Sequence, residues 1–233
     1  MDKKIEFFLK VTKTEYINNL TKQGFLYLTL AEEFRNRKRF GGKKYDSEEG
    51  RLSKQYKMWI DLGRNDFKDP HTIFDVSNGK IEGGECVYCL KAIFREEINR
   101  KGIIVPYEFL NDLIDTDNWS EYSLLLIKNV DGFLDCVEQS AQKYDYSYLF
   151  KLVQYDNHFF ECDNPLISDE AAKEIYFHKR EKFKEQSEYR ILLQNDRHED
   201  LKIEIGTDFF TIENYIQVDN LQSFKTGKPL LLI

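Results

Sequence analysis

Three polar side chains spaced by two residues, Gln186, Glu188 and Arg190, lie where a charged segment gives way to an apolar run. Residues two apart in an extended chain point to the same face, so an amide, a carboxylate and a guanidinium share one face where a strand begins. Such a face is suited to holding a polar ligand, and it is also an ordinary way to begin an edge strand. The spacing selects Glu188 as the candidate acid and leaves a ligand-facing and a structural role open.

Positive charge gathers in residues 176–184, just before this triplet, although the whole chain has a formal net charge of −7. Its lysines and arginine stand at positions 179, 180, 182 and 184. Cationic side chains along one groove attract anions and donate hydrogen bonds to them. The residues that we predict to bind a ligand there are His178, Lys179, Arg180, Lys184 and Arg190. The alternative is a solvated face on which Glu181 and Glu185 cancel the charge.

Metal and thiol chemistry have little support in the sequence. Cys86 and Cys89 form a CxxC pair, but the pair lies inside an apolar, strand-like run, where side chains three apart point to opposite faces. We therefore predict no disulfide between them and no bound metal. The acidic residues 46–49 before Gly50 could bind a divalent ion through oxygen ligands, but their spacing is not that of an EF-hand, and a solvated loop is the alternative. The chain lacks HExxH, GxSxG, P-loop and GxGxxG patterns.

Composition excludes several classes of protein. Of the 233 residues, 41% are hydrophobic, and 18 Phe and 14 Tyr supply bulky side chains for a core, so the chain is globular rather than disordered. The net charge of −7 argues against a general nucleic-acid or anionic-membrane surface. No apolar run approaches the about 20 residues that span a bilayer, and no small-residue cleavage site follows the N-terminal apolar stretch. We therefore expect a cytoplasmic protein with reduced cysteines.

Hydrophobic periodicity predicts the elements that must position the candidate site. Strands are predicted at 5–11, 25–30, 86–94, 121–127, 148–155, 189–193, 201–205 and 215–218, with weaker signals at 56–62 and 72–76. Helices are predicted at 13–23, 31–39, 106–114, 131–144 and 168–177. This order favours an α+β fold, a single domain over residues 1–233 with a mixed, mostly antiparallel sheet flanked by helices. An irregular insertion is expected at about 40–84.

The apolar runs also predict which side chains form the core. The residues expected in strands and mostly buried are Phe7, Leu9, Leu26, Leu28, Val87, Leu125, Ile127, Val153, Ile191 and Leu193.

A glutamate at the start of a strand, with Gln two residues before it and an apolar run after it, resembles the catalytic turn of toxin-type ADP-ribosyltransferases. The resemblance implies an ADP-ribosyltransferase-like fold and an NAD-binding site. It also implies that Glu188 is the catalytic carboxylate, which hydrogen-bonds the nicotinamide ribose and stabilises a developing oxocarbenium ion. Gln186 would contact the acceptor side chain. The cationic segment is predicted to flank a groove for an anion, either the NAD phosphate or an acidic partner.

Further stretches occur along most of the chain. They are Gly24-Phe25-Leu26-Tyr27-Leu28 with a short Phe-Arg helix after it, Asp46 followed by Glu49-Gly50, the run CVYCLKAI, Val153-Gln154-Tyr155, and Phe183 followed by Gln186-x-Glu188-Tyr189-Arg190. In these stretches the chain resembles a family of uncharacterised bacterial and prophage proteins, some of whose relatives are abortive-infection proteins. This second resemblance implies a shared fold and a role in phage–host conflict.

The leading hypothesis is a phage-defence or toxin-like protein with an ADP-ribosyltransferase-like site that binds NAD. The alternative is a non-catalytic sensor or inhibitor that works through a protein partner. A metal-dependent nuclease is a third, although the acidic residues lack a lysine-containing nuclease motif. A catalytic Glu188 requires a cleft with aromatic and Arg or Lys neighbours. The binding module requires a salt-bridged Glu188 on a surface and an exposed apolar patch elsewhere.

Overall fold

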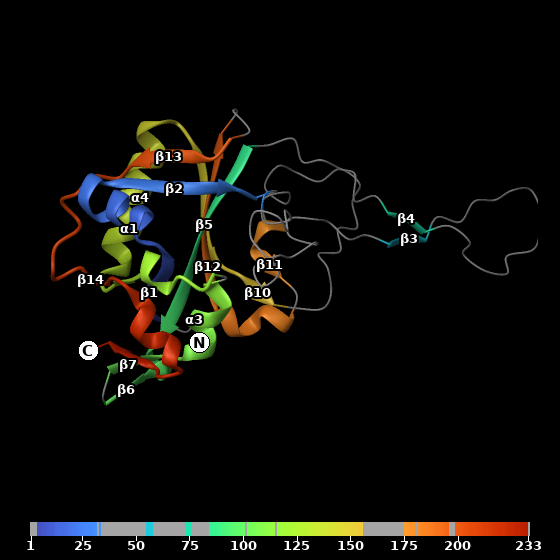
Figure 1. The fold of residues 1–233 in the computed structure, drawn as a ribbon. Coiled ribbons are helices and arrows are strands. Elements are labelled where there is room, and N and C mark those ends of the chain that lie inside the picture. The colour runs from blue at the N-terminus through green and yellow to red at the C-terminus, as the bar shows by residue number, and fades with distance from the viewer. Residues whose placement is uncertain are drawn as a thin grey trace, which may run out of the picture.

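The computed structural model describes residues 4–31, 33, 84–100, 102–114, 116–155, 175–179, 181–195 and 199–232, together with the backbone of 55–57 and 73–75. These residues form an α+β fold, as the hydrophobic periodicity predicts (Figure 1). Within these ranges, every helix is too short or too polar to span a bilayer.

Among the described residues, the main sheet has eight strands. They are β1 (Ile5–Lys13), β2 (Phe25–Leu30), β5 (Gly84–Phe94), β8 (Tyr122–Ile127), β9 (Ser147–Leu152), β12 (Glu188–Asn195), β13 (Leu201–Glu204) and β14 (Tyr215–Val218). Their pairings are antiparallel. One edge of β5 pairs with β12, from Lys91 opposite Glu188 to Gly84 opposite Asn195, and β12 in turn pairs with β9.

The sheet forks at the other edge of β5. The second half of β5 pairs with β1, with Lys91 opposite Leu9, whereas its first half pairs with β2, with Val87 opposite Thr29. The β1 branch continues through β8 to β14, and the β2 branch continues to β13. Figure 1 shows β2 and β13 lying across the long strand β5. We call the divergence of β1 and β2 from β5 the fork.

The α-helices connect and cover these strands. They are α1 (Thr14–Gln23), which joins β1 to β2, α3 (Tyr107–Leu113), and α4 (Val130–Lys143), which joins β8 to β9. α1 ends at Gly24, whose φ of 72° is left-handed and whose N–H bonds to the Leu20 carbonyl. A Cβ at Gly24 would approach the backbone of Gly206 to 2.6 Å, so this turn between α1 and β2 requires glycine.

Smaller elements complete the described structure. β6 (Ile98–Asn99), β7 (Gly102–Val105) and β15 (Leu230–Leu232) form one small sheet, β10 (Gln154–Tyr155) and β11 (His178–Lys179) pair in parallel, and β3 (Gln55–Lys57) pairs with β4 (Ile73–Asp75). The 3-10 helices are η2 (Arg95–Glu97), η3 (Trp119–Glu121), η4 (Ile175–Phe177), η5 (Glu181–Gln186) and η6 (Leu221–Thr226).

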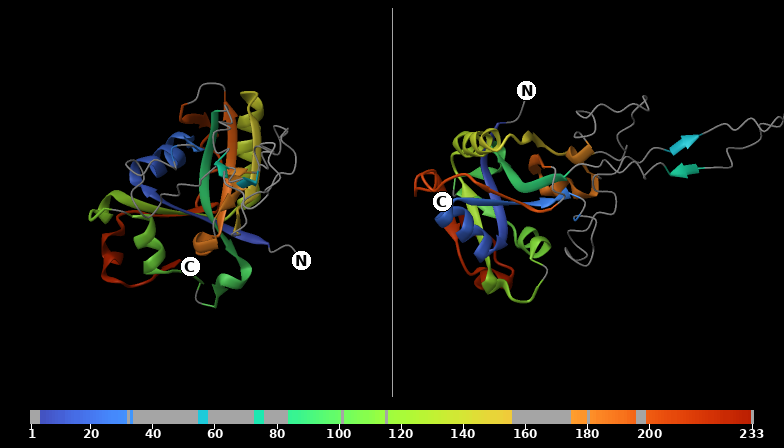
Figure 2. Two further views of the ribbon diagram at one scale, coloured as in Figure 1. Left: turned by 90° about the vertical axis from the view of Figure 1, so that its right-hand side faces the viewer. Right: turned by 90° about the horizontal axis from the view of Figure 1, so that it is seen from above.

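The branch formed by β1 and β8 is buried on both faces. Phe8 and Leu125 pack into a cluster that contains residues of α1, α4 and β12, whereas Leu9 and Leu124 pack into a second cluster with α3, η6 and the small sheet. This division follows from the alternation of side chains along a strand. In Figure 1 and in the left view of Figure 2, α3 and the small sheet lie at the lower end of the molecule.

The strands and helices predicted within the described ranges are confirmed, with ends that differ by a few residues, except that the single strand predicted at 148–155 is two strands, β9 and β10, in different sheets. The expected core side chains are buried in strands, except that Phe7 is half-buried and Val153 lies just past the end of β9. The periodicity does not predict the small sheet, because its strands are short and come from distant parts of the sequence. The helices expected at 31–39 and 168–177 and the insertion at about 40–84 fall mostly outside the described residues.

Candidate functional site at the fork of the sheet

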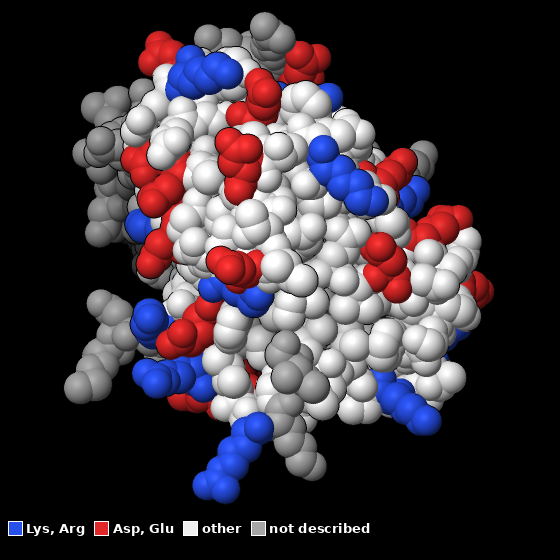
Figure 3. Space-filling model, turned by 90° about the vertical axis from the view of Figure 1, so that its left-hand side faces the viewer, with Lys and Arg blue, Asp and Glu red and all other residues white. Residues whose placement is uncertain are grey.

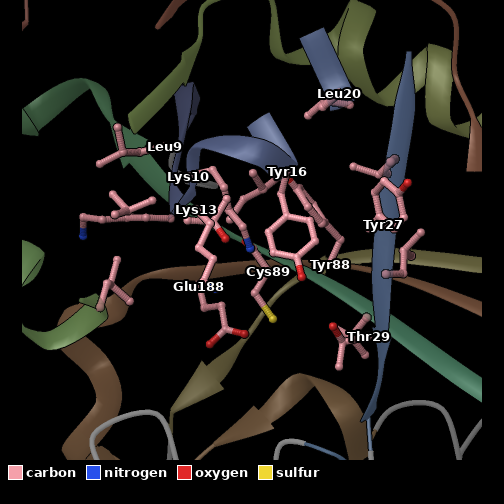
Figure 4. Close-up of a pocket in the computed structure, with 18 of the residues that line it drawn as sticks. Leu9, Lys10, Lys13, Tyr16, Leu20, Tyr27, Thr29, Tyr88, Cys89 and Glu188 are labelled. Carbon is pink, nitrogen blue, oxygen red and sulfur yellow. The ribbon is translucent and has the colours of Figure 1, made fainter. Parts of the chain in front are cut away.

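A pocket of about 740 Å³ lies at the fork, between β1 and β2 and above the middle of β5. Leu9–Lys13 form one wall, Phe25–Thr29 form the other, and Val87–Lys91 form the floor. The helix between the two walls adds Tyr16 and Leu20. We call this the fork pocket. Figure 4 shows Lys10, Tyr16, Tyr27, Cys89 and Glu188 gathered around it.

Lys10 secures the floor of the fork pocket. On β5, Tyr88 and Cys89 lie between the residues that pair with β1 and those that pair with β2. The Lys10 ammonium donates to the Cys89 carbonyl at 2.7 Å and lies 4.3 Å from the centre of the Tyr88 ring. A lysine therefore satisfies a backbone acceptor where the sheet divides. Burial lowers the pKa of Lys10, although Cys89 and Glu188 oppose this.

The fork pocket is cationic and aromatic. Among the described residues, five lysines and two carboxylates line it: Lys10, Lys13, Lys91, Lys179, Lys202, Glu188 and Asp200. Four tyrosines and two phenylalanines also line it: Tyr16, Tyr27, Tyr88, Tyr122, Phe25 and Phe109. On the face of the molecule shown in Figure 3, Asp and Glu are interspersed with Lys and Arg, so that face has no wider basic surface. In a chain of net charge −7, this local excess of ammonium groups favours an anionic ligand.

Backbone hydrogen bonds fix the position of Glu188 at the start of β12. The Glu188 N–H donates to the Tyr155 hydroxyl at 2.8 Å, and the Glu188 carbonyl accepts from the Val153 N–H at 2.8 Å. Just before it, Ser187 has a left-handed φ of 43° and accepts from the Ala92 N–H at 2.8 Å. The chain thus leaves η5 and enters the sheet within one residue. As a result Glu188 is the first residue of β12, and its side chain forms part of the pocket wall.

A buried ion cluster holds the Glu188 carboxylate. Arg190 Nε donates to Glu188 Oε1 at 2.6 Å, and Lys179 Nζ donates to Glu188 Oε2 at 2.8 Å and to Gln186 Oε1 at 2.9 Å. The side chains of Arg190, Glu188 and Lys179 are 2%, 8% and 9% exposed. Arg190 Nη1 also donates to the Tyr176 carbonyl, which ties η4 to the sheet.

This cluster keeps Glu188 ionised. Burial raises the pKa of Glu188, but the charges of Arg190 and Lys179 and the hydrogen bond from Arg190 outweigh it and hold the pKa well below its ordinary value. A hydrogen bond from the Cys89 side chain also lowers the pKa of Glu188. The pocket wall therefore carries a permanent negative charge among the lysines.

The structure brings together some of the residues selected from the sequence. Gln186, Glu188 and Lys179 line the fork pocket, and Arg190 supports Glu188 from behind. His178 is half-buried on β11 and Lys184 is exposed on η5, and neither is among the described residues that line the pocket. Arg180 lies outside the described residues. Gln186 ends a 3-10 helix, so Lys179, and not strand alternation, links it to Glu188.

Sequence reasoning misses the lysines and aromatic residues of the two walls. Lys10 interrupts the apolar run of β1, and Phe25, Tyr27 and Thr29 alternate with leucines along β2. A lysine within a buried strand and an aromatic face on a short strand are the signals that could have selected them. Their convergence depends on the fork, which no local pattern indicates.

The two thiols of the CxxC pair lie in different surroundings. Cys86 is buried and its thiol donates to the Glu199 carbonyl at 3.3 Å, whereas Cys89 lines the fork pocket. Both are free. Burial, reinforced by Glu188, raises the pKa of Cys89 to about 12, so its thiol stays protonated near neutral pH. Cys162 and the acidic residues 46–49 lie outside the described residues, within which no group of His, Cys, Asp and Glu is arranged to hold a metal ion.

Acid should remove the stability that Glu188 contributes. Because its pKa is lower in the folded chain than the ordinary 4.5, this contribution is complete above about pH 4.5 and is lost as the pH falls through the folded value. Urea unfolding of the wild type and of Glu188→Gln should give a difference in unfolding free energy that is constant near neutral pH and shrinks in acid. A difference that is the same at pH 7 and pH 3 would contradict a depressed pKa.

Comparison of the chain with protein-family models, with curated proteins and with solved structures found no match.

Proposed function

We propose that this chain binds NAD in the fork pocket and that Glu188 acts on it in the manner of an ADP-ribosyltransferase. The observation that carries the proposal is an ionised carboxylate, Glu188, in the wall of a pocket lined by five lysines and several aromatic rings among the described residues. Lysines suit the diphosphate of NAD, and aromatic rings suit its planar bases.

The side chains of the pocket wall fit the demands of ADP-ribosyl transfer. NAD supplies a bond between nicotinamide and ribose whose cleavage develops positive charge on the ribose. Glu188 presents a full negative charge at neutral pH and is held in one orientation by Arg190 and Lys179, so it needs no reorganisation to stabilise that charge. Gln186 is joined to the same lysine and in this proposal contacts the acceptor side chain.

A second function, a non-catalytic sensor or inhibitor, is favoured by the same ion cluster. Both oxygens of Glu188 already have a cationic partner, as expected of a carboxylate that holds the fold together. The small sheet also presents an exposed apolar pair, Ile104 opposite Leu231, where a protein partner could dock. In that case NAD would bind and be released intact.

The proposed setting is phage defence in the cytoplasm, as an abortive-infection or toxin-like protein. It is supported by the resemblance of Gly24–Leu28, the β5 run and the Phe183–Arg190 segment to the bacterial and prophage family. In this setting the acceptor of the ADP-ribosyl group is a protein target.

Binding of NAD should be saturable and should weaken as salt is added, because ammonium groups supply the attraction. Calorimetric titration at several salt concentrations measures this. Lys13→Gln with Lys202→Gln, two exposed lysines of the pocket, should weaken binding roughly tenfold and reduce the salt dependence.

The matched control is Lys143→Gln with Lys228→Gln, which makes the same change in net charge at exposed residues outside the pocket lining. It should leave the affinity for NAD unchanged. No heat of binding, or an affinity that does not respond to salt, would reject the proposal.

A further inference from the structure

The pocket wall formed by β2 has an aromatic face. Along Phe25–Leu30, the three leucines are buried in the core, and Phe25, Tyr27 and Thr29 are half-buried on the side that lines the fork pocket. Since alternate residues of a strand point to opposite faces, the core needs only the leucines. The two rings are therefore available to the pocket.

A third ring comes from the helix that follows β1. Tyr16 is 45% exposed, and the centre of its ring lies 6.0 Å from that of Tyr27 at an interplanar angle of 62°. It lines the fork pocket (Figure 4). A tyrosine exposed to this degree contributes little to the core, and its edge-on contact leaves ring surface available for stacking.

A lysine stands over the same rings. Lys202 is opposite Tyr27 in the register of β13 and β2, and its ammonium lies 3.7 Å from the centre of the Phe25 ring and 5.4 Å from that of Tyr27. Cation–π attraction holds the ammonium beside the aromatic surface. A planar ligand ring in contact with Tyr27 would meet a hydrogen-bond donor at its edge.

The other lysines of the pocket come from elements other than β2 and β13, and Lys179 among them is on β11 and bound to Glu188. Lys10 and Lys13 belong to β1, and Lys91 belongs to the second half of β5. The fork separates these elements from β2. Aromatic rings line both sides of the pocket, but on the β1 side Lys10 and Lys91 lie over the rings of Tyr88 and Phe109. Three lysines thus gather on the β1 side, and Tyr16, Phe25 and Tyr27 gather with one lysine on the β2 side, which matches a ligand with phosphates at one end and a planar ring at the other.

We propose that Tyr16, Phe25, Tyr27 and Lys202 form a subsite for the planar heteroaromatic base of a nucleotide, whose phosphates lie toward Lys10, Lys13 and Lys91. This inference rests on the proposed function and extends it, because it assigns the two ends of the ligand to opposite walls. Base-on-aromatic stacking changes affinity by about 1–3 kcal/mol per base, which corresponds to a factor of about 5 to 150.

The test compares ligands with and without a base. ADP, nicotinamide mononucleotide and inorganic diphosphate are titrated into the wild type, Tyr16→Leu and Tyr27→Leu. The exposed Tyr16 can be replaced with little effect on folding, and thermal melting checks both variants. Each variant should weaken binding of ADP, nicotinamide mononucleotide or both about tenfold, and leave binding of diphosphate unchanged. The nucleotide whose affinity falls more identifies the base that the subsite holds, adenine for ADP or nicotinamide for nicotinamide mononucleotide.

Tyr144→Leu is the matched control. Tyr144 is 41% exposed, stacks on Tyr146 with ring centres 5.8 Å apart, and has the Lys143 ammonium 5.2 Å from its ring. It is thus a similar cluster outside the pocket lining, and its loss should change no affinity.

Three results would overturn the subsite. If ADP and nicotinamide mononucleotide bind and both folded variants bind them as the wild type does, the base lies elsewhere and the proposed function stands without the subsite. If the variants lose diphosphate and nucleotides alike, the aromatic residues shape the whole pocket and do not select the base. If the wild type binds none of the three ligands, the subsite and the proposed function are rejected together.

Discussion

Replacing Arg190 with Met is expected to lower the free energy of unfolding by about 3–5 kcal/mol, the usual cost of removing one member of a buried ion pair. The guanidinium is 2% exposed, donates to Glu188 Oε1 at 2.6 Å and donates to the Tyr176 carbonyl. Met has a similar length but no donors, so a carboxylate with a depressed pKa and a buried carbonyl both lose a partner. Urea unfolding at neutral pH measures the change.

A surface ion pair provides the control for this prediction. Lys225 Nζ lies 3.0 Å from Asp117 Oδ1, but the lysine side chain is 37% exposed and the aspartate is fully exposed. Lys225→Met should therefore leave the unfolding midpoint close to that of the wild type. If Arg190→Met is as stable as Lys225→Met, the ion cluster does not anchor Glu188 in the way that its geometry indicates.

The fold was predictable where local pattern and tertiary structure agree. The run CVYCLKAIF predicts the long strand β5, because buried strands need β-branched, aromatic and aliphatic side chains on both faces. Gly24 predicts the end of α1, since a left-handed residue there is needed for the turn into β2. The small sheet was not predictable in this way, because β15 finds its partner β7 in a distant part of the chain.

The candidate site was predictable only in part. The spacing of Glu188 and Arg190 on β12 does place both side chains on one face, as strand alternation requires. The contact of Lys179 with Gln186 and Glu188 requires the parallel pairing of β11 with β10, which has no local signal. The lysines of the pocket converge because β1 and β2 leave β5 in different directions, and the position of that fork is a property of long-range register.

Replacing Glu188 with Gln should reduce the rate of NAD cleavage on the order of a hundredfold or more, because the charge that stabilises the transition state is lost while the shape is kept. The affinity for NAD should be equal to or higher than that of the wild type, because the pocket loses a carboxylate and keeps its lysines. The variant is also expected to be less stable, so rates are compared per folded molecule, below the unfolding transition. In cells, protection against phage or toxicity should be lost with the cleavage activity.

The most direct test of the account is the release of free nicotinamide from NAD, measured by chromatography for the wild type and for folded Glu188→Gln. The account predicts steady release by the wild type and a hundredfold lower rate for the variant, with NAD still bound by both. Equal rates per folded molecule would contradict a catalytic Glu188. Binding of NAD by the wild type without any release of nicotinamide would contradict the catalytic proposal and leave the sensor, in which Glu188 serves only to hold β11 against β12.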